Sequence, residues 1–340
     1  MKKLNILIFL LLLLGYSNLI IAQSENIKYS NYDDMYKSVM QHFNQQDYQE
    51  AIGILESHLK IFPENLEANC INLAICYSSI EMFKEGTDAL FYGLDNNIWY
   101  NKYAFFSEIW TPLKEFCTFP MFIEENNLKQ IEAQKNSKPD ILVLKPENYS
   151  PDKEYPLFIT LHGGGGNIPG FKNLWTSELM KKEFIVAYLQ SSQLVSMNGY
   201  SWDDKTIANN EIKDAYTKIL KNYKIKTDEI IIGGFSSGGV ASLESIQFYD
   251  IPYCGFITLS PPKPEEFSEE QVSFMISKNI RGSIITNPKD PRYNDQRKMA
   301  DTYKALGMGY LFVDTPAIGH WFPENLDKLI DQSINFIRNK

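Results

Sequence analysis

Apolar side chains follow two different spacings along the chain. From about residue 30 to 135 they recur at intervals of three and four, as in Met35, Val39 and Phe43, and this spacing predicts helices. Beyond about residue 139, short apolar runs alternate with helical patterns. The runs at 141–144, 157–161, 184–189, 229–233, 256–259, 282–286 and 310–314 are expected to be strands, and those at 206–223, 239–248, 265–277, 294–306 and 323–338 helices.

Strands that alternate with helices predict a mostly parallel sheet with helices on both faces, and hence an α/β fold. The run from Leu157 to Leu161 is apolar apart from Thr160, as is typical of a strand buried on both faces. A polar stretch, residues 134–140, precedes the change of spacing and is the expected linker. We therefore expect an all-helical domain over residues 23–135 and an α/β domain over residues 139–340.

The helical region contains an internal repeat. Residues 47–51, DYQEA, return as residues 82–86, MFKEG, an offset of 35 that is close to the roughly 34 residues of a helix-turn-helix repeat. An aromatic residue three positions before a small one, the pattern Leu73-Ala74-x-x-Tyr77 and the closing Pro63 resemble the tetratricopeptide repeat family. The resemblance implies a concave surface for a peptide or protein partner; the alternative is that the helical pairs only brace the next domain. The chain departs from the family pattern at three positions, Val39, His58 and Ile98.

The amino terminus has the pattern of a targeting sequence. Lys2 and Lys3 precede an apolar stretch from Leu4 to Leu14, and a more polar run ends at Ala22. This order is typical of a secretory signal peptide. We therefore expect residues 1–22 to be removed and the protein to be exported to the periplasm or outside the cell, without stable membrane insertion. The alternative is an uncleaved anchor, because the stretch approaches the length of a short membrane span.

Composition narrows the class of protein further. Among 340 residues, 44% hydrophobic and 22% charged side chains exclude a disordered chain and a multi-span membrane protein. The 33 basic and 42 acidic side chains give a net charge of −9, which argues against a nucleic-acid partner. The four histidines are scattered without ligand spacing, so neither a metal nor a cofactor is expected. For the four cysteines, buried free thiols are favoured over a disulfide.

The sharpest chemical signal is the sequence Gly234-Phe-Ser236-Ser-Gly238, with an apolar strand before it and a helical run after it. A serine at such a strand-to-helix elbow presents its hydroxyl at the carboxyl edge of a sheet, and the glycines leave room for neighbouring backbone. Ser236 is therefore the expected nucleophile. The alternative, a glycine-rich turn that starts a phosphate-binding helix, lacks the lysine of a nucleotide P-loop.

A serine hydroxyl needs a base to remove its proton. His320 is the only histidine that follows Ser236 in the chain, and it lies between a predicted strand and the last predicted helix. The third member should be an acid that orients the imidazole. Asp290, four residues past a predicted strand, is favoured; the alternatives are Asp295 and Asp314.

A run of four glycines follows the predicted strand 157–161 and begins after His162. Glycine lets backbone N–H groups turn toward a developing negative charge, so Gly164, Gly165 and the N–H of Ser237 are the expected oxyanion donors. The alternative is a flexible loop, and His162 is expected to brace it rather than to act as a base. Five side chains are expected near the substrate: His162, Gln190, Trp202, Phe235 and Trp321. For Gln190 the alternative is that it caps a strand, and for Trp202 that its segment caps the following helix.

Residues 139–340 resemble the α/β-hydrolase superfamily, with Ser236, Asp290 and His320 in the chain order that this superfamily uses. Within it, the glycine loop and the GFSSGG motif look like those of secreted esterases related to polyester depolymerases, feruloyl esterases and the phospholipase/carboxylesterase group. The resemblance implies hydrolysis of a carboxylic ester, small or polymer-linked, through an acyl-enzyme. The alternatives are a serine peptidase or an acyltransferase on the same fold, or a binding protein that uses its helical repeats.

Overall fold

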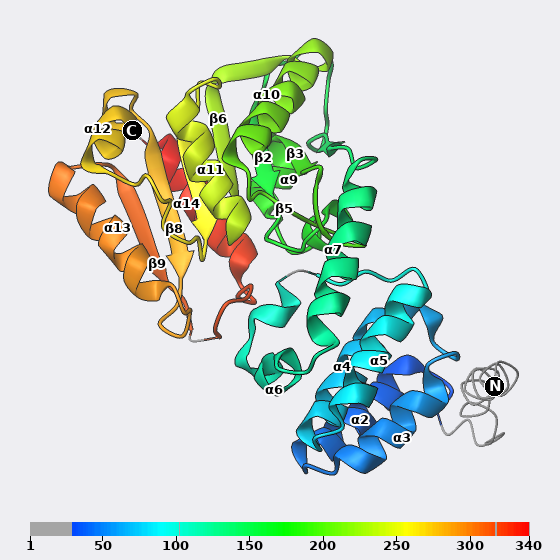
Figure 1. Ribbon diagram of the computed structural model, residues 1–340. Coiled ribbons are helices and arrows are strands. Elements are labelled where there is room, and N and C mark those ends of the chain that lie inside the picture. The colour runs from blue at the N-terminus through cyan, green and yellow to red at the C-terminus, as the bar shows by residue number, and fades with distance from the viewer. Residues whose placement is uncertain (1–28, 102, 317, 340) are drawn as a thin grey trace, which may run out of the picture. The chain divides into compact units, whose positions relative to one another are not determined.

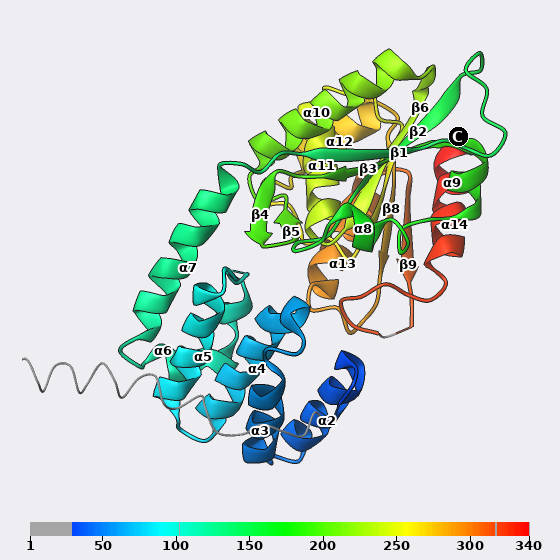
Figure 2. The same ribbon diagram turned by 90° about the vertical axis from the view of Figure 1, so that its right-hand side faces the viewer.

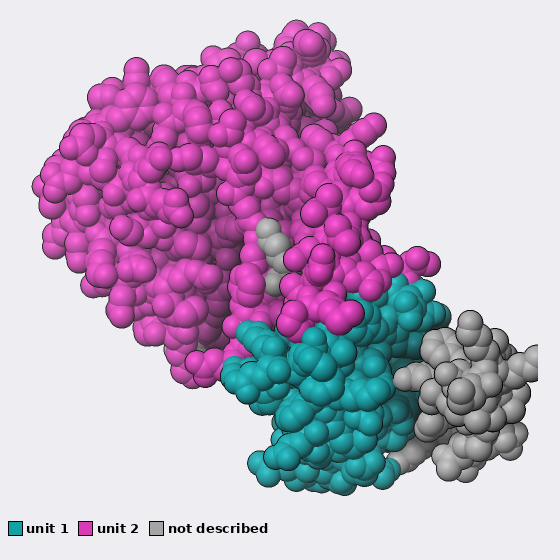
Figure 3. All heavy atoms as spheres, viewed as in Figure 1, with its two compact units in different colours: residues 1–96, 109–119 teal, residues 97–108, 120–340 magenta. Residues whose placement is uncertain are grey.

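The computed structural model describes residues 29–101, 103–316 and 318–339. The predicted signal peptide, residues 1–22, lies outside this range. Within the described residues, no helix combines the length and the apolar character that crossing a membrane requires. The chain forms two compact units, coloured separately in Figure 3: residues 29–96 with 109–119, and residues 97–108 with 120–339.

The first unit is built from helices. They are α2 (Tyr32–Asn44), α3 (Tyr48–His58), α4 (Leu66–Ser79), α5 (Phe83–Asp95) and the short α6 (Thr111–Lys114). Neighbours in the chain pack together, α2 on α3, α3 on α4 and α4 on α5 (Figure 1). Side chains at three- and four-residue spacing, such as Met35, Val39 and Leu55, are buried among them. The predicted helical amino-terminal region is confirmed.

The 35-residue repeat is visible in the backbone of this unit. Gln46 and Glu81 both adopt left-handed conformations, with φ of 61° and 62°. In each turn the next N–H donates to the carbonyl five residues earlier at 2.9 Å. Two successive helix pairs therefore share one turn geometry, while membership of the tetratricopeptide family stays a prediction.

The second unit contains a seven-stranded sheet of order β1-β3-β2-β6-β7-β8-β9. The bounds are β1 (Asp140–Leu144), β2 (Tyr155–Leu161), β3 (Ile185–Gln190), β6 (Ile225–Phe235), β7 (Gly255–Leu259), β8 (Arg281–Thr286) and β9 (Tyr310–Asp314). β1 runs antiparallel to β3, and every other pair is parallel. The predicted mostly parallel sheet is confirmed.

Helices cover both faces of this sheet (Figure 2). One face carries α10 (Lys205–Asn222), α11 (Ser237–Phe248), α12 (Glu269–Ser277) and α13 (Tyr293–Leu306), and the other carries α8 (Ile168–Phe171), α9 (Glu178–Glu183) and α14 (Leu326–Arg338). In β2, Leu157 and Ile159 enter the first core and Phe158 enters the second. Alternate residues of one strand fill both cores, which explains why the strand is apolar almost throughout.

Helix α7 (Phe119–Gln134) belongs to the second unit from Pro120 onward. The Gln134 side chain donates to the Ser192 carbonyl and accepts from the Leu194 N–H, both at 2.8 Å. Gln130 donates to the Leu194 carbonyl at 2.8 Å. These bonds attach α7 to a hairpin of β4 (Gln193–Ser196) and β5 (Gly199–Ser201).

The compact units thus differ from the predicted domain limits, 23–135 and 139–340, in where they place α7. Residues 97–108 join it in the second unit, because buried Asn126 accepts from the Tyr100 N–H at 2.6 Å and donates to the Tyr100 carbonyl at 3.0 Å. Apolar spacing gives no sign of this, since it reports the period of a helix and not the surface on which the helix packs.

Removing the Gln134 amide should expose the N–H that it covers. We expect Gln134→Ala to speed hydrogen exchange at Leu194 about five- to tenfold, since one such bond contributes roughly 1 kcal/mol to the protection of an amide. Hydrogen exchange followed by NMR or mass spectrometry measures this. Glu132→Ala, an exposed change on the same helix, is the control. Equal exchange rates at Leu194 in the two variants would contradict the attachment.

Candidate active site

Ser236 lies at a sharp turn between β6 and α11. Its backbone has φ 53° and ψ −118°, which a non-glycine residue rarely adopts, and its N–H donates to the Leu259 carbonyl at 2.9 Å. The turn is tight because a Cβ at Gly234 or at Gly238 would lie 2.4 Å from the Leu161 carbonyl oxygen. Only glycine fits at both positions, and the turn presents the Ser236 hydroxyl at the carboxyl edge of the sheet.

Ser236, His320 and Asp290 form a continuous chain of hydrogen bonds. Ser236 Oγ lies 2.8 Å from His320 Nε2, and His320 Nδ1 lies 2.6 Å from Asp290 Oδ2. With the proton assigned to Nδ1, the imidazole donates to the carboxylate and accepts from the serine hydroxyl. The Asp290 side chain is fully buried, whereas that of His320 is 27% exposed. The arrangement can take a proton from Ser236 and stabilise the imidazolium that results.

Hydrogen bonds keep Asp290 ionised in spite of its burial. Burial alone would raise the pKa of Asp290, but hydrogen bonds from His320 and from the Arg292 N–H lower it below its ordinary value. The Arg292 N–H donates to Oδ1 at 2.8 Å. Oδ2 is therefore directed to the imidazole while Oδ1 is held by the backbone.

Asn287 fixes the loop that carries His320. Its side chain donates to the Gly319 carbonyl at 2.7 Å and accepts from the Gly319 N–H at 3.1 Å. The other two acids weighed from the sequence lie apart from the imidazole and form ion pairs of their own. Asp295 pairs with Lys298 at 3.1 Å, and Asp314 pairs with Arg297 at 3.8 Å.

Of the two glycines predicted as oxyanion donors, the geometry favours Gly164. A Cβ there would lie 3.4 Å from Ser237 Oγ, so this part of the loop faces the start of α11. Gly165, at φ 77°, donates its N–H to the Tyr200 carbonyl at 2.8 Å. An N–H engaged in this way is not available to an oxyanion, and the prediction for Gly165 does not fit the structure. The N–H groups of Gly164 and Ser237 remain as the candidate pair.

The segment between β3 and α10 braces the glycine loop. The Tyr200 N–H donates to the Gly166 carbonyl at 2.9 Å, which completes a two-way bridge. The Trp202 indole donates to the His162 carbonyl at 2.9 Å. Asn167 donates to the Asn198 carbonyl at 2.8 Å. Gly165 and Gly166 are therefore held by backbone bonds to a hairpin that lies outside the predicted motif.

His162 is buried at the start of this loop. Its Nδ1 lies 2.8 Å from the Gly163 carbonyl oxygen, and its ring lies 5.1 Å from that of Trp202. Burial lowers the pKa of His162 to about 4, although the bond to Gly163 acts in the opposite direction. His162 is thus neutral near pH 7 and donates to the loop.

The remaining predicted substrate residues occupy different surroundings. Phe235 lies between the rings of His320 and Phe322, at centroid distances of 4.9 and 4.5 Å. Trp321 is 60% exposed. Trp202 is buried, and Gln190 accepts from the Ile168 N–H at 3.2 Å and so fixes the start of α8.

Two cavities adjoin the Ser236 turn. Phe235 lines the first and Ser237 lines the second. The first, of about 310 Å³, is mainly apolar and is lined by the glycine loop with Phe171, Leu174, Phe235, Trp321 and Phe322. The second, of about 590 Å³, is lined by Ser237, Val240, Trp202 and charged side chains that include Asp203, Lys205, Glu244, Lys263 and Glu265. The site therefore offers an apolar and a charged surface to a bound molecule.

Several residues of this site carry no signal in the sequence. Tyr103, from the helical half of the chain, donates to Asp203, which lines the second cavity. Arg292 Nη1 lies 3.4 Å from His320 Nε2. Neither belongs to a recognisable motif, and Tyr103 lies 100 residues before its partner. Only the folded chain brings them to the site.

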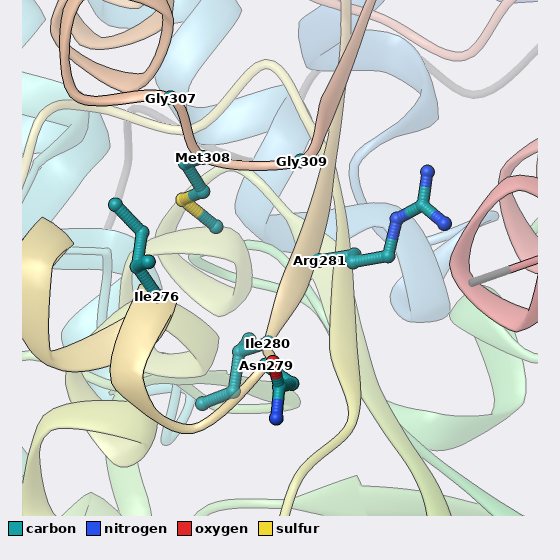
Figure 4. Close-up of a pocket in the computed structure, with 7 residues that line it drawn as sticks. All are labelled: Ile276, Asn279, Ile280, Arg281, Gly307, Met308 and Gly309. Atoms are coloured by element: carbon teal, nitrogen blue, oxygen red, sulfur yellow. The ribbon is translucent and has the colours of Figure 1, made fainter.

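A further hollow, of about 300 Å³, lies at the opposite edge of the sheet, where β8 and β9 begin (Figure 4). Ile276, Ile280 and Met308 give it apolar walls beside Arg281, and the predicted site residues do not line it. Among the residues that the structure describes, no three His, Cys, Asp or Glu side chains come close enough to hold a metal ion.

Comparison with known proteins finds a family match within the second unit. The sequence model of the phospholipase/carboxylesterase family matches residues 149–281. Acyl-protein thioesterase 1 of Debaryomyces hansenii is 30% identical over 131 residues, which cover 37% of this chain and 54% of that protein, so the chain spans about half the length of this curated relative.

One solved structure shares the fold, and a second shows a weaker similarity. An uncharacterized protein from Bacillus cereus ATCC 10987 is 24% identical, with a TM-score of 0.52, over 91% of this chain and 99% of its own. The phospholipase/carboxylesterase of Dyadobacter fermentans DSM 18053 is 16% identical, with a TM-score of 0.45, over 58% of this chain and 97% of its own.

The depressed pKa of His162 predicts a loss of stability in acid. Below its ordinary pKa of 6.5 the unfolded chain binds a proton that the native state takes up only near pH 4, so the free energy of unfolding falls as the pH falls between these values. From pH 7 to pH 5 this residue should contribute a loss of about 2 kcal/mol. Urea denaturation of the wild type and of His162→Gln measures it. The variant should show the smaller pH dependence; equal slopes would show that His162 does not contribute.

Proposed function

Because the sequence model of the phospholipase/carboxylesterase family matches residues 149–281, we propose that this protein hydrolyses carboxylic esters through a covalent acyl-enzyme. The observation that carries the proposal is the chain of hydrogen bonds from Ser236 through His320 to the buried Asp290, at 2.8 and 2.6 Å. Ser236 is the nucleophile, His320 the general base and Asp290 the acid that orients it.

Acylation follows from this geometry. Ser236 Oγ attacks the ester carbonyl carbon while His320 Nε2 takes the hydroxyl proton, and the carbonyl oxygen becomes an oxyanion. The N–H groups of Gly164 and Ser237 stabilise that charge. Asp290 holds the proton on Nδ1 and stabilises the imidazolium. The imidazolium then protonates the leaving alcohol as the bond to it breaks, and the acyl group stays on Ser236.

Deacylation repeats these steps with water in place of Ser236. His320 Nε2 takes a proton from the water, whose oxygen attacks the acyl carbon, and the same N–H groups stabilise the second oxyanion. Collapse releases the carboxylic acid and returns the proton to Ser236 Oγ. The first cavity, of about 310 Å³, supplies an apolar surface beside Phe235 for one half of the ester.

A thioester is a second candidate substrate, favoured by the similarity to acyl-protein thioesterase 1 of Debaryomyces hansenii. The chemistry differs only in the leaving atom, because sulfur replaces the alcohol oxygen, so the same three residues would serve.

Export to the periplasm or outside the cell and a protein or peptide partner for the helical repeats are part of the proposal. The first is supported by the sequence of residues 1–22, and the second by the repeated turn geometry at Gln46 and Glu81.

Removing the nucleophile should abolish turnover. We expect Ser236→Ala to lower the release of p-nitrophenol from short acyl esters at least about 10⁴-fold, with an unchanged far-UV circular dichroism spectrum. A fluorophosphonate probe should label the wild type and not the variant. Ser277→Ala, at an exposed position near the end of α12, is the control and should keep full activity and labelling. Full turnover by Ser236→Ala would refute the proposal.

Replacing the orienting acid should leave the binding of the ester in place but impair the base. Asp290→Asn is expected to lower kcat about 10³- to 10⁴-fold, because an amide can donate a hydrogen bond to Nδ1 and so favours the wrong tautomer of His320. Steady-state kinetics with the same ester measures this. The kcat values of Asp295→Asn and Asp314→Asn should stay within about twofold of the wild-type value, since both acids form ion pairs with other side chains. If kcat falls in only one of these two variants and not in Asp290→Asn, that acid and not Asp290 orients His320.

A further inference from the structure

Arg292 places a positive charge against the base. Its Nη1 lies 3.4 Å from His320 Nε2, the atom that also accepts from the Ser236 hydroxyl at 2.8 Å. A neutral imidazole nitrogen has a single lone pair, so two donors compete for it. The serine hydroxyl must win this competition for the nucleophile to form.

The guanidinium has no carboxylate of its own. In the described part of the chain Arg292 forms no ion pair, whereas Arg297 on the same helix pairs with Asp314 at 3.8 Å. Asp290 is the acid nearest to Arg292 along the sequence, but it does not form an ion pair with the guanidinium. Its Oδ2 is directed to His320, and its Oδ1 accepts from the Arg292 backbone N–H. Arg292 is half-buried and occupies the position just before α13, a helix of 14 residues whose dipole adds to the positive potential.

The Arg292 guanidinium opposes catalysis unless an anion binds to it. When Ser236 is deprotonated, His320 becomes an imidazolium beside the guanidinium, and two like charges at this distance repel. An anion that draws the guanidinium aside would free the lone pair for Ser236 and then offset this repulsion.

We propose that Arg292 binds an anionic group, a carboxylate or a phosphate, on the leaving half of the ester. This rests on the proposed function, because it assigns the substrate class of the same site. The leaving oxygen must come within roughly 3 Å of His320 Nε2 to receive its proton. Since Nη1 lies 3.4 Å from that nitrogen, the guanidinium lies within about 6.4 Å of the leaving oxygen. An anion a few bonds beyond that oxygen can form a two-pronged contact with the guanidinium.

The test compares two esters of one shape. 3-Acetoxybenzoate carries a carboxylate on its phenol half, and 3-acetoxybenzamide is its neutral counterpart. We expect the wild type to show a kcat/KM ratio, anionic over neutral, of about 10 or more, and Arg292→Gln to lower this ratio roughly 10- to 100-fold. Arg292→Lys, which keeps the charge without the planar fork, should give an intermediate ratio. Arg297→Gln removes an equal charge from the same helix and should leave the ratio unchanged.

The outcomes separate this inference from the proposed function. If the wild type hydrolyses neither ester nor any neutral ester, the proposed function fails. If it hydrolyses both and Arg292→Gln lowers both rates equally, Arg292 is structural and the anion site is refuted. If Arg297→Gln lowers the kcat/KM ratio as much as Arg292→Gln does, the preference comes from the overall positive charge of the region, and the anion site at Arg292 is refuted. Phenyl hemisuccinate, with its carboxylate on the acyl half, should show no such dependence on Arg292; if it does, the assignment to the leaving half is wrong.

Discussion

The site depends on how closely three stretches of backbone approach one another at the end of β2. The Leu161 carbonyl oxygen lies 2.4 Å from where a Cβ at Gly234 or Gly238 would be, so no side chain fits at either position. This approach forces Ser236 into a conformation that costs of the order of 1–3 kcal/mol. The glycine loop starts at His162, the next residue of the same strand end. One close approach therefore sets both the backbone strain at Ser236 and the place where the glycine loop begins.

The supports of the site come from far along the chain. Asn287 ties the Asp290 loop to the His320 loop through Gly319, and Tyr200 ties the glycine loop to the β4–β5 hairpin. The hairpin is in turn attached to α7 by Gln134. Each link ends on a backbone group, and those at Asn287 and Gln134 each depend on one amide side chain. The reacting groups sit on loops, but these loops are held by regular elements.

The sequence predicts the sheet well because each of its strands contains a short apolar run, and helices separate most of the strands. The order of Ser236, Asp290 and His320 could also be predicted, since few histidines are available and the glycine motif marks the elbow. The β4–β5 hairpin could not, because it is short and half-exposed and lacks a clear alternation. Arg292 and Asn287 could not be predicted for another reason: each contacts one residue of a distant loop, and no local pattern encodes such a contact.

The two compact units are interleaved along the sequence, because α7 and residues 97–108 belong to the second unit. The chain leaves the first unit at residue 96, returns to it for residues 109–119, and then leaves it again. A single cut cannot release either unit as one continuous polypeptide. A fragment that starts at residue 139 would lack α7, and the hairpin that braces the glycines would lose its anchor. Neither unit can therefore be removed or exchanged as one continuous segment of the chain.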